Sequence, residues 1–329
     1  MRQTKKDHVD TKPLLVKNLL LIEGHTRAGK FFLGKILCGF DKIEHYQYES
    51  IIEVTGHLEM LKFIPRETAK FLLQLHIDEC AYNIRVGRKL NFRLSDNSSL
   101  LNSFDMARYV RRAFEERPHH EVLSEFRHDG RYSTFVTHES MLNIKLYFET
   151  FPHLKVISII RHPVDVIHSL YMKGWGKREG QDPISMGPCI ATDNTSVPWY
   201  AFNWAKQYMK MAQMDRIIYM MKNLSILNQK GYQALSPKEK NRILIIKHEN
   251  IIQKTDHIIK KIGNFLKVNP QKFMPNLLKR EGCYRRILPE GREKKIREIK
   301  KKASKEIFEE MMALAQDYEK KSESGKWVQ

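Results

Sequence analysis

Residues 18–37 read NLLLIEGHTRAGKFFLGKIL, and this stretch decides the fold. The apolar run at residues 19–22 is typical of a buried β-strand, and residues 31–37 have the apolar spacing of a helix. Glycines at positions 24 and 29 mark a turn between the two segments. A strand that leads through a Gly-rich turn directly into a helix is typical of an open α/β sheet, in which ligands bind at that turn.

The rest of the chain repeats this alternation of apolar strands and helices. Strands are expected at residues 131–137, 154–160 and 242–247, and helices follow them at residues 141–150, 163–172 and 256–266. Near-continuous apolar strands separated by helices are typical of a parallel sheet that is covered on both faces. We therefore predict an α/β protein with a central parallel sheet flanked by helices. Two mostly helical insertions are expected at residues 57–83 and 199–221.

No stretch of linker composition divides the chain, so we predict a single domain over residues 1–329 with its core at about residues 18–292. Apolar residues spaced by three or four predict a basic amphipathic C-terminal helix at about residues 293–320. Residues 174–198 are rich in Gly, Pro, Ser, Asp and Asn and show no periodicity. Loops this long inside a domain are often functional, so this segment is a candidate lid over a substrate.

The composition excludes several classes of protein. The chain has 329 residues and is 42% hydrophobic, which is typical of a folded globular protein rather than a disordered one. Its 4 Cys are far apart, so neither a disulfide framework nor a structural metal site is expected and a reducing compartment is favoured. The N-terminus lacks an apolar targeting segment, and no early apolar run is long enough to span a bilayer. We expect a soluble cytoplasmic protein.

The formal net charge of +19 raises the alternative of a nucleic-acid-binding protein, because clustered Lys and Arg attract phosphates. Much of this charge is local: residues 279–302 contain eleven Lys or Arg and four Glu. On an amphipathic helix, such residues usually form a solvated face. No zinc finger, helix-turn-helix or RNA-binding aromatic motif accompanies the charge.

The turn at residues 24–30 has the features of an anion-binding loop. Successive backbone N–H groups and the positive end of a helix favour a phosphate at this position. Gly29 lets the backbone approach the anion, and Arg27 and Lys30 supply full charges. The segment satisfies G-x-x-x-x-G-K of the Walker A pattern, but Phe31 stands where a Ser or Thr should hold Mg²⁺. A P-loop kinase therefore remains an alternative, although this sequence lacks the hydroxyl residue that would bind Mg²⁺ in such an enzyme.

A second candidate anion site lies in residues 156–170, VISIIRHPVDVIHSL. Arg161 ends the expected strand and Ser169 lies two turns into the following helix, so both can face an anion at the carboxyl edge of the sheet. Pro163 suits the first helical position, and Asp165 complements the positive end of the helix. The alternative is that Arg161 only pairs with Asp165.

The Arg-Ala-Gly-Lys loop together with the downstream Arg-His-Pro-Val-Asp-Val-Ile-His-Ser segment resembles the sulfotransferase family that uses 3′-phosphoadenosine 5′-phosphosulfate (PAPS). The resemblance implies a P-loop-NTPase-like sulfotransferase fold, PAPS as donor, adenosine 3′,5′-bisphosphate as product, and no metal. It also implies that the first loop holds the 5′-phosphosulfate and that Arg161 and Ser169 hold the 3′-phosphate. The full set of donor-binding residues implied in this way is Arg27, Ala28, Gly29, Lys30, Phe31, Arg161, Ser169, His248 and Arg292.

Three of these positions depart from the family pattern. Lys30 and Phe31 replace two hydroxyl residues of the first loop, and His248 replaces a common Tyr after the late strand at residues 243–247. The C-terminal loop that contains Arg292 resembles its family counterpart only loosely.

Residues 134–139, TFVTHE, resemble the strand that ends in the family's catalytic base. The acceptor must lose a proton as it attacks, so a base is needed there, and His138 is the candidate because histidine side chains in general titrate near neutrality. Glu139 is the reserve base, and a structural role for a lone histidine is the alternative. Arg27, with Lys30 beside it, would stabilise the leaving phosphate.

The expected acceptor is a hydroxyl or amine compound, with a carbohydrate or glycan preferred and a small alcohol, a phenol or a lipid head group as the alternatives. Insertions at residues 57–105 and 174–200 are expected to build its pocket. A His/Arg-rich approach to the base would suit a sugar or an anionic acceptor, although the same residues also suit a solvated loop. These residues are His119, His120, Arg127, His128 and Arg131.

Overall fold

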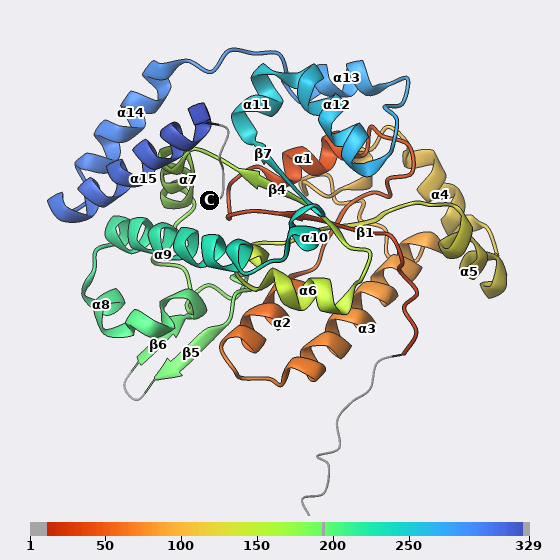
Figure 1. Cartoon of the computed structure of the whole chain (residues 1–329), viewed down its shortest axis with the longest axis horizontal. Helices are drawn as coiled ribbons and strands as arrows, with labels where there is room; N and C mark the ends of the chain where they lie inside the picture. The colour runs from red at the N-terminus through yellow and green to blue at the C-terminus, as the bar shows by residue number, and fades with distance from the viewer. Residues whose placement is uncertain (1–11, 193–194, 325–329) are drawn as a thin grey trace, which may run out of the picture.

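The computed structural model describes residues 12–192 and 195–324, and it is built around a five-stranded parallel sheet (Figure 1). The sheet order is β2-β3-β1-β4-β7. The bounds of the strands are β1 Leu19–Glu23, β2 Gln47–Tyr48, β3 Ser133–Val136, β4 Lys155–Ile160 and β7 Ile243–Lys247. The predicted α/β class with a central parallel sheet is confirmed, and four of its strands lie where the apolar runs indicated. The two-residue strand β2 was not predicted.

The register of the sheet brings the candidate site segments together. β1, all five of whose residues are buried, lies between β3 and β4, with Ile22 opposite Val136 on one side and Ile157 on the other. The carboxyl ends of parallel strands meet at one edge of a sheet. The segments that follow β1, β3, β4 and β7 therefore all begin at that edge.

Helices cover both faces of the sheet (Figure 1). One face packs against the apolar sides of α1 Lys30–Leu37, α12 Thr255–Leu266 and α13 Met274–Arg280, with the short helix α11 His248–Gln253 between them. The other face packs against α3 Arg66–Arg85 and α6 Ile144–Thr150. A third cluster joins α7 Pro163–Met172 and α9 Gln213–Gln233 to the C-terminal helices.

The two insertions are helical, with bounds that differ from the expected ones. The first consists of α2 Ser50–Met60 and α3, and the second of the 3₁₀ turn η3 Trp199–Trp204, α8 Ala205–Lys210 and the 21-residue α9. The segment 174–198, expected to have no regular structure, contains the short antiparallel pair β5 Cys189–Thr192 and β6 Thr195–Pro198. Strands of four residues are too short for a periodic sequence pattern to reveal.

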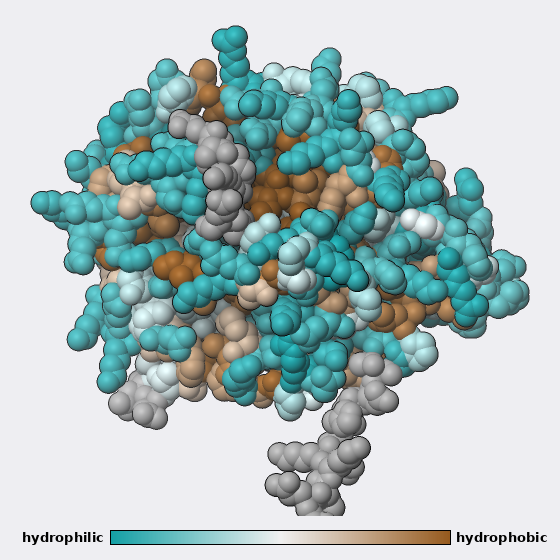
Figure 2. Space-filling view, in the orientation of Figure 1, coloured by the Kyte–Doolittle hydropathy of each residue, from teal (hydrophilic) through white to brown (hydrophobic). Residues whose placement is uncertain are grey.

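The expected single helix at residues 293–320 is wrong: the segment forms two helices, α14 Pro289–Lys300 and α15 Lys305–Ser324. Ile299, Ile307 and Met311 are buried, so the apolar spacing continues across the break and hid it. Ser304 immediately precedes α15, and its N–H donates to Asp215 Oδ1 at 2.9 Å. This face of the molecule is mostly hydrophilic over both helices (Figure 2).

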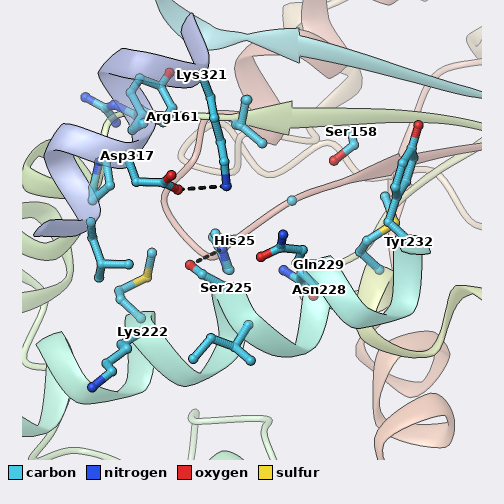
Figure 3. A pocket seen from close by; sticks show the side chains of 18 of the residues that line it. His25, Ser158, Arg161, Lys222, Ser225, Asn228, Gln229, Tyr232, Asp317 and Lys321 are labelled. Atoms are coloured by element: carbon cyan, nitrogen blue, oxygen red, sulfur yellow. Dashed lines mark hydrogen bonds and ion pairs between the residues drawn. The ribbon is translucent and has the colours of Figure 1, made fainter. Parts of the chain in front are cut away.

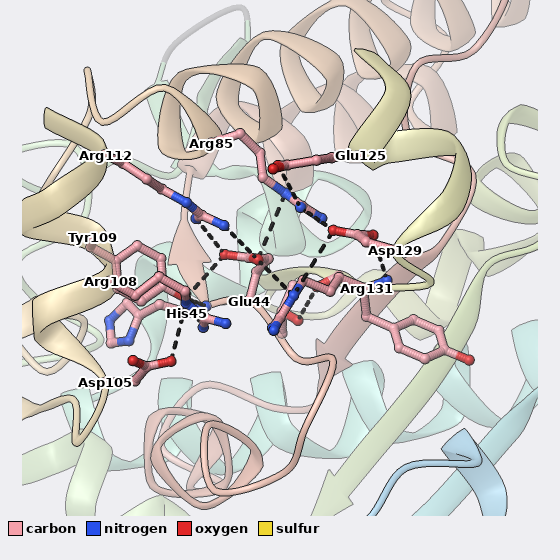
Figure 4. A network of polar contacts seen from close by, with 12 residues as sticks. Glu44, His45, Arg85, Asp105, Arg108, Tyr109, Arg112, Glu125, Asp129 and Arg131 are labelled. Carbon is pink, nitrogen blue, oxygen red and sulfur yellow. Dashed lines mark hydrogen bonds and ion pairs between the residues drawn. The ribbon is translucent and has the colours of Figure 1, made fainter. Parts of the chain in front are cut away.

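A buried ion network fixes α4 Met106–Phe114 and α5 His119–His128 beside the sheet (Figure 4). Its centre is Glu44, which is 1% exposed and accepts hydrogen bonds from Arg112 at 2.8 and 3.1 Å. Arg85, also 1% exposed, lies 3.7 Å from the same carboxylate and pairs with Asp129. Burial opposes ionisation of Glu44, but the surrounding guanidinium groups hold the pKa of its carboxyl well below the usual range.

None of the helices in the described part of the chain combines the length and the apolar composition that crossing a membrane requires. Residues 1–11, in which the sequence shows no apolar targeting segment, lie outside the described residues.

Candidate active site

In the loop between β1 and α1, three residues have a positive φ: two of them are glycines, which adopt it without strain, and one is an arginine. Gly24 and Gly29 have φ values of 152° and 107°, and Arg27 has a φ of 72°. A Cβ at position 29 would lie only 2.5 Å from Cδ2 of His248, which is too close for two carbon atoms that are not bonded. Only glycine therefore fits at position 29.

Lys30 lies under this loop rather than over its open side. Its side chain is 2% exposed, and Nζ donates to the carbonyl oxygens of Gly24 at 2.8 Å and of His25 at 2.6 Å. Burial lowers the pKa of its ammonium to about 8, against the attraction of Glu139 and Glu23. The expectation that Lys30 contacts the leaving phosphate does not fit this placement. Its side chain instead holds the shape of the loop.

Arg27, Arg161 and Ser169 come together as expected. The Nε–H of Arg27 donates to Ser169 Oγ at 2.9 Å, and an N–H of Arg161 donates to the carbonyl oxygen of Arg27 at 3.1 Å. Burial and the neighbouring Arg161 both lower the pKa of Arg27. Among residues 12–192 and 195–324, no carboxylate lies within ion-pair distance of either guanidinium. Two adjacent positive charges without a paired carboxylate suit a ligand with several negative charges.

His248 and Arg292 border the same cluster. His248 packs against Gly29, and its ring centroid lies 5.5 Å from that of Phe32. Burial, reinforced by the charge of Arg161, lowers the pKa of His248 to about 4, so the ring is neutral at pH 7. Arg292 Nη2 lies 3.2 Å from Asp165 Oδ2, at the start of α7. Asp165 pairs with Arg292 and with Lys295 at 2.5 Å, and so leaves Arg161 unpaired.

Glu139 is locked into the structure of the loop. It is 5% exposed and accepts hydrogen bonds from His25 Nδ1 at 2.6 Å and from the N–H of Thr26 at 2.9 Å. Burial alone would raise its pKa, but His25, Lys30 and the Thr26 N–H lower it to about 2. A carboxylate this acidic is a poor proton acceptor at neutral pH. Glu139 therefore orders the loop, which makes the reserve base a weak candidate.

His138 is paired with a carboxylate that the sequence did not single out. Glu53 Oε2 accepts hydrogen bonds from Nδ1 of His138 at 2.8 Å and from its backbone N–H at 2.6 Å. The hydroxyl of Tyr48 donates to the other oxygen, Oε1, at 3.1 Å. Although Glu53 is buried, His138 lowers the pKa of its carboxyl, so it is ionised at pH 7. With the Nδ1 proton held in this way, Nε2 can accept a proton.

The side chain of Phe31 packs beside His138, the partner of Glu53, and not beside the anion-binding loop. Its ring centroid lies 5.7 Å from that of Tyr48 and 6.3 Å from that of His138. Ala28 is fully buried under the loop. Neither side chain has a hydrogen-bond donor, so only the backbone N–H groups of these two residues could bind an anion.

His138 and Glu139 both line a cavity of about 220 Å³ beside the loop. Helix α2 supplies Glu53 and His57, and α9 supplies Met220 and Leu224. The expected lid segment 174–198 contributes much of the remaining wall, including Trp175, Arg178, Glu179, Ile184 and Met186. In the expected insertion 57–105, His57 alone reaches the described lining.

A larger cavity, of about 490 Å³, lies behind the loop between the sheet, α9 and α15 (Figure 3). His25 lines it and lies 3.4 Å from Ser225 Oγ of α9 through Nε2. Because the other ring nitrogen of His25 bonds Glu139, this histidine separates the two cavities. The floor contains Glu23, whose pKa is raised by burial although it accepts a hydrogen bond from Ser158 at 2.7 Å.

The basic segment expected near His138 lies elsewhere. Arg131 precedes β3, whereas His138 follows it, so the length of the strand separates them. Arg131 faces Glu44 at 3.9 Å, and His119 bonds the hydroxyl of Tyr82. The expectation of a His/Arg-rich approach to the base is therefore wrong, and it no longer favours a sugar or an anionic acceptor.

One group of metal-ligating side chains stands apart from the site. Within the part of the chain that the structure describes, Glu49, His76 and Cys80 place their ligand atoms within 4.8 Å of one another. The Lys89 ammonium lies 2.8 Å from Glu49 Oε1 and already supplies a positive charge there.

Comparison with known proteins defines the class. The model of the sulfotransferase domain family matches residues 20–329, so the chain belongs to that family. The match extends past residue 292 and includes α14 and α15. A search of curated proteins found no match.

Solved structures similar to this chain are also sulfotransferases. The sulfotransferase domain of the Synechococcus PCC 7002 olefin synthase is 14% identical, with 97% of this chain and 98% of that chain covered and a TM-score of 0.44. The sulfotransferase domain from the curacin biosynthetic pathway is 12% identical, with 79% and 77% covered and a TM-score of 0.44. A sulfotransferase from Alicyclobacillus acidocaldarius is 12% identical, with 92% and 96% covered and a TM-score of 0.38. Because these TM-scores are below 0.5, the assignment to the family rests on the match of the family model to residues 20–329.

Proposed function

We propose that this protein transfers a sulfuryl group from PAPS to the hydroxyl, or amine, of an acceptor, with His138 as general base. The observation that carries the proposal is the cluster of Arg27, Arg161 and Ser169 at the carboxyl edge of the sheet, with no carboxylate paired to either guanidinium in the described ranges. PAPS supplies the sulfuryl group and three phosphorus- or sulfur-centred negative groups that need such charges.

The residues fit this donor. Gly29 gives the loop its left-handed backbone conformation directly before α1, and the N-terminus of α1 favours negative charge there. Arg161 and Ser169 would hold the 3′-phosphate, while Arg27 would hold the 5′-phosphosulfate. The neutral ring of His248 and the guanidinium of Arg292 would border the nucleoside.

In the transfer, Nε2 of His138 accepts the proton of the acceptor hydroxyl as the hydroxyl oxygen forms its bond to sulfur. The bond between sulfur and the bridging phosphate oxygen breaks, and Arg27 stabilises the charge that develops on that oxygen. Glu53 stabilises the imidazolium form of His138 through the bond at 2.8 Å. His138 then releases its proton to solvent, and adenosine 3′,5′-bisphosphate leaves.

Two features suit this reaction better than a metal-dependent kinase. Phe31 supplies no hydroxyl for Mg²⁺ and instead packs beside His138. Arg161 has no role in a Walker-type phosphate transfer, but it has one in binding a 3′-phosphate. The four cysteines are free thiols, which supports our further proposal of a reducing, cytoplasmic location.

The test compares thermal unfolding with adenosine 3′,5′-bisphosphate, with ATP plus Mg²⁺, and with an oligonucleotide. We expect the bisphosphate to stabilise the protein, by the ordinary linkage between binding and unfolding. Stabilisation by ATP with Mg²⁺ alone would refute the proposal, and stabilisation by the oligonucleotide alone would favour nucleic-acid binding. The variant His138→Ala should keep the bisphosphate shift and lose transfer from labelled PAPS. If it keeps full transfer, another group is the base.

A further inference from the structure

His57, on α2, is a buried histidine whose hydrogen-bonding groups are unused. It is 4% exposed, and neither Nδ1 nor Nε2 has a hydrogen-bond partner in the described structure. Its ring stacks on Trp199, with centroids 3.7 Å apart and planes at 15°. Burying a polar group without a partner costs free energy, so such groups call for an explanation. His57 lines the 220 Å³ cavity that contains His138.

Most other polar groups of this cavity are already engaged within the protein. The hydroxyl of Tyr48 donates to Glu53, and the hydroxyl of Tyr200 donates to Glu179 at 2.8 Å. Arg178 pairs with Asp182 at 2.8 Å, and its buried Nε–H has no partner. The lining also contains the hydroxyls of Thr26 and Ser185 and the indole N–H groups of Trp175 and Trp199. Among the lining side chains, His57 is the one with two buried ring nitrogens that both lack a partner.

The charges around the cavity favour a neutral acceptor. The one cationic side chain of the lining with a permanent charge, Arg178, pairs with Asp182, and the carboxylate of Glu53 pairs with His138. Glu179 accepts hydrogen bonds from Tyr200 and from the N–H of Gly176. Burial lowers the pKa of His57 to about 4, so this ring is neutral at pH 7 and has one donor and one acceptor nitrogen.

The size and wall of the cavity limit the acceptor further. Benzene fits a cavity of about 150 Å³, so about 220 Å³ holds one substituted ring. The remaining wall is apolar, formed by side chains such as Val54, Trp175, Trp199, Met220 and Leu224. A monosaccharide would bring more hydroxyl groups than the two histidines can satisfy, and an oligosaccharide could not enter the cavity whole. Exposed Ile184 and Met186 mark the open side of the cavity.

We propose that the acceptor is a small neutral aromatic compound with a hydroxyl group at His138, and that His57 hydrogen bonds to a second polar group on its ring. This inference rests on the proposed sulfotransferase reaction and adds the class of its acceptor. His57 determines specificity and takes no part in the proton transfer.

The experiment uses two probes that differ in one polar group. 3-Hydroxyacetophenone has a carbonyl group that His57 can bond, and 3-ethylphenol has nearly the same shape without it. The measured quantity is the ratio of kcat/KM for the two probes. A comparison of this ratio between wild type and variants cancels the intrinsic difference in phenol reactivity.

His57→Phe keeps a ring against Trp199. In this variant we expect the ratio of kcat/KM for the ketone to kcat/KM for 3-ethylphenol to fall about tenfold, as for loss of one hydrogen bond. His57→Gln keeps an amide donor and acceptor and should retain part of the ratio, and it replaces the Phe variant if that variant does not fold. The matched control is Trp199→Phe, which alters the same stack and leaves both His57 and His138 in place. It should change both probes by a similar factor and leave the ratio close to that of wild type.

An unchanged ratio in both His57 variants would overturn the role of His57. A higher kcat/KM for an oligosaccharide than for either phenol would overturn the acceptor class. Binding of the two probes is also measured by calorimetry, on protein saturated with adenosine 3′,5′-bisphosphate or, if that does not bind, on protein alone. A ketone preference that depends on His57, without any transfer, would uphold the site and refute the sulfotransferase reaction. Sulfuryl transfer to both probes without a ketone preference that depends on His57 would uphold the sulfotransferase reaction and refute the role of His57.

Discussion

The pairing of Glu53 with His138 leads to a quantitative prediction about Glu53→Gln. In the wild type, Oε2 of Glu53 accepts both hydrogen bonds from His138, and Oε1 accepts the hydrogen bond from Tyr48. A glutamine can place its oxygen at the Oε2 position and its amide at the Oε1 position, where the Tyr48 hydroxyl can turn and accept. The substitution therefore keeps the position of the imidazole and removes only the negative charge.

The size of the effect follows from the geometry. Nδ1 of His138 lies 2.8 Å from Oε2, so the centres of charge of the imidazolium and the carboxylate are about 4 Å apart when His138 holds the proton. At an effective dielectric constant of about 20, this attraction is about 4 kcal/mol. Because the charge of His138 forms only as the acceptor loses its proton, the loss appears in the chemical step. We expect kcat to fall by roughly 10² to 10³-fold.

The assay is the initial rate of transfer from labelled PAPS, with bisphosphate binding measured by calorimetry on the same protein. The bisphosphate affinity should be unchanged, because Glu53 lies apart from Arg27 and Arg161. Tyr48→Phe is the matched control: it removes one hydrogen bond to Glu53 but leaves its charge, so its loss of kcat should be much smaller. A Glu53→Gln variant with kcat within threefold of wild type and normal binding would refute the role of the pair.

Three further predictions concern binding and stability. Arg161→Ala should weaken binding of adenosine 3′,5′-bisphosphate in calorimetry by roughly 10- to 100-fold, as for loss of a charge-assisted hydrogen bond, whereas Arg297→Ala, on the exposed side of α14, should leave it unchanged; equal affinities would place the 3′-phosphate elsewhere. The pKa of Glu139 is about 2 in the folded protein and ordinarily 4.5, so its ionised form stabilises the fold by at most about 3 kcal/mol. This contribution is complete above pH 4.5 and is lost as the pH falls toward 2. The free energy of urea unfolding should depend less on pH across that window in Glu139→Gln than in wild type, and an equal pH dependence in the two proteins would contradict the lowered pKa. Glu44→Gln should lower the free energy of unfolding by about 3–5 kcal/mol because it leaves buried guanidinium groups without their carboxylate, whereas exposed Glu309→Gln should have little effect; similar urea midpoints for the two would argue against the network.

The sequence was sufficient to predict four of the five strands of the central sheet and to expect Arg27, Arg161 and Ser169 at one edge of the sheet. Continuous apolar runs identified β1, β3, β4 and β7, and residues that follow parallel strands meet at one edge. Arg27 follows β1 and Arg161 follows β4, and these strands are neighbours, so local motifs implied their proximity. The bond between Arg27 and Ser169 fits that expectation.

The acceptor side could not be derived in this way. Glu53 and His57 lie on α2, about 85 residues before His138, and β2 brings them near through a two-residue pairing with β3. A signal was present, because Glu53 interrupts the apolar run at residues 51–54, and a charge inside such a run indicates a buried carboxylate. The partner of that carboxylate depends on tertiary structure alone.

Lys30 shows a different limit. Its position in the G-x-x-x-x-G-K pattern indicates a charge at the loop, but the motif does not specify which side of the loop the ammonium occupies. The buried carboxylates Glu23 and Glu139 lie below the loop and attract it inward.

The bonds beneath the loop have a consequence for how fast the proposed donor would bind. Lys30 holds the carbonyl groups of Gly24 and His25, and Glu139 holds the Thr26 N–H, so the loop is ordered by the protein's own groups. A ligand that enters an ordered loop does not lose affinity to the entropy of ordering it. Association is then governed by diffusion and by the positive field of Arg27 and Arg161, which makes the on-rate sensitive to ionic strength. Turnover at low donor concentration would therefore fall as salt rises, even where the folded structure is unaffected.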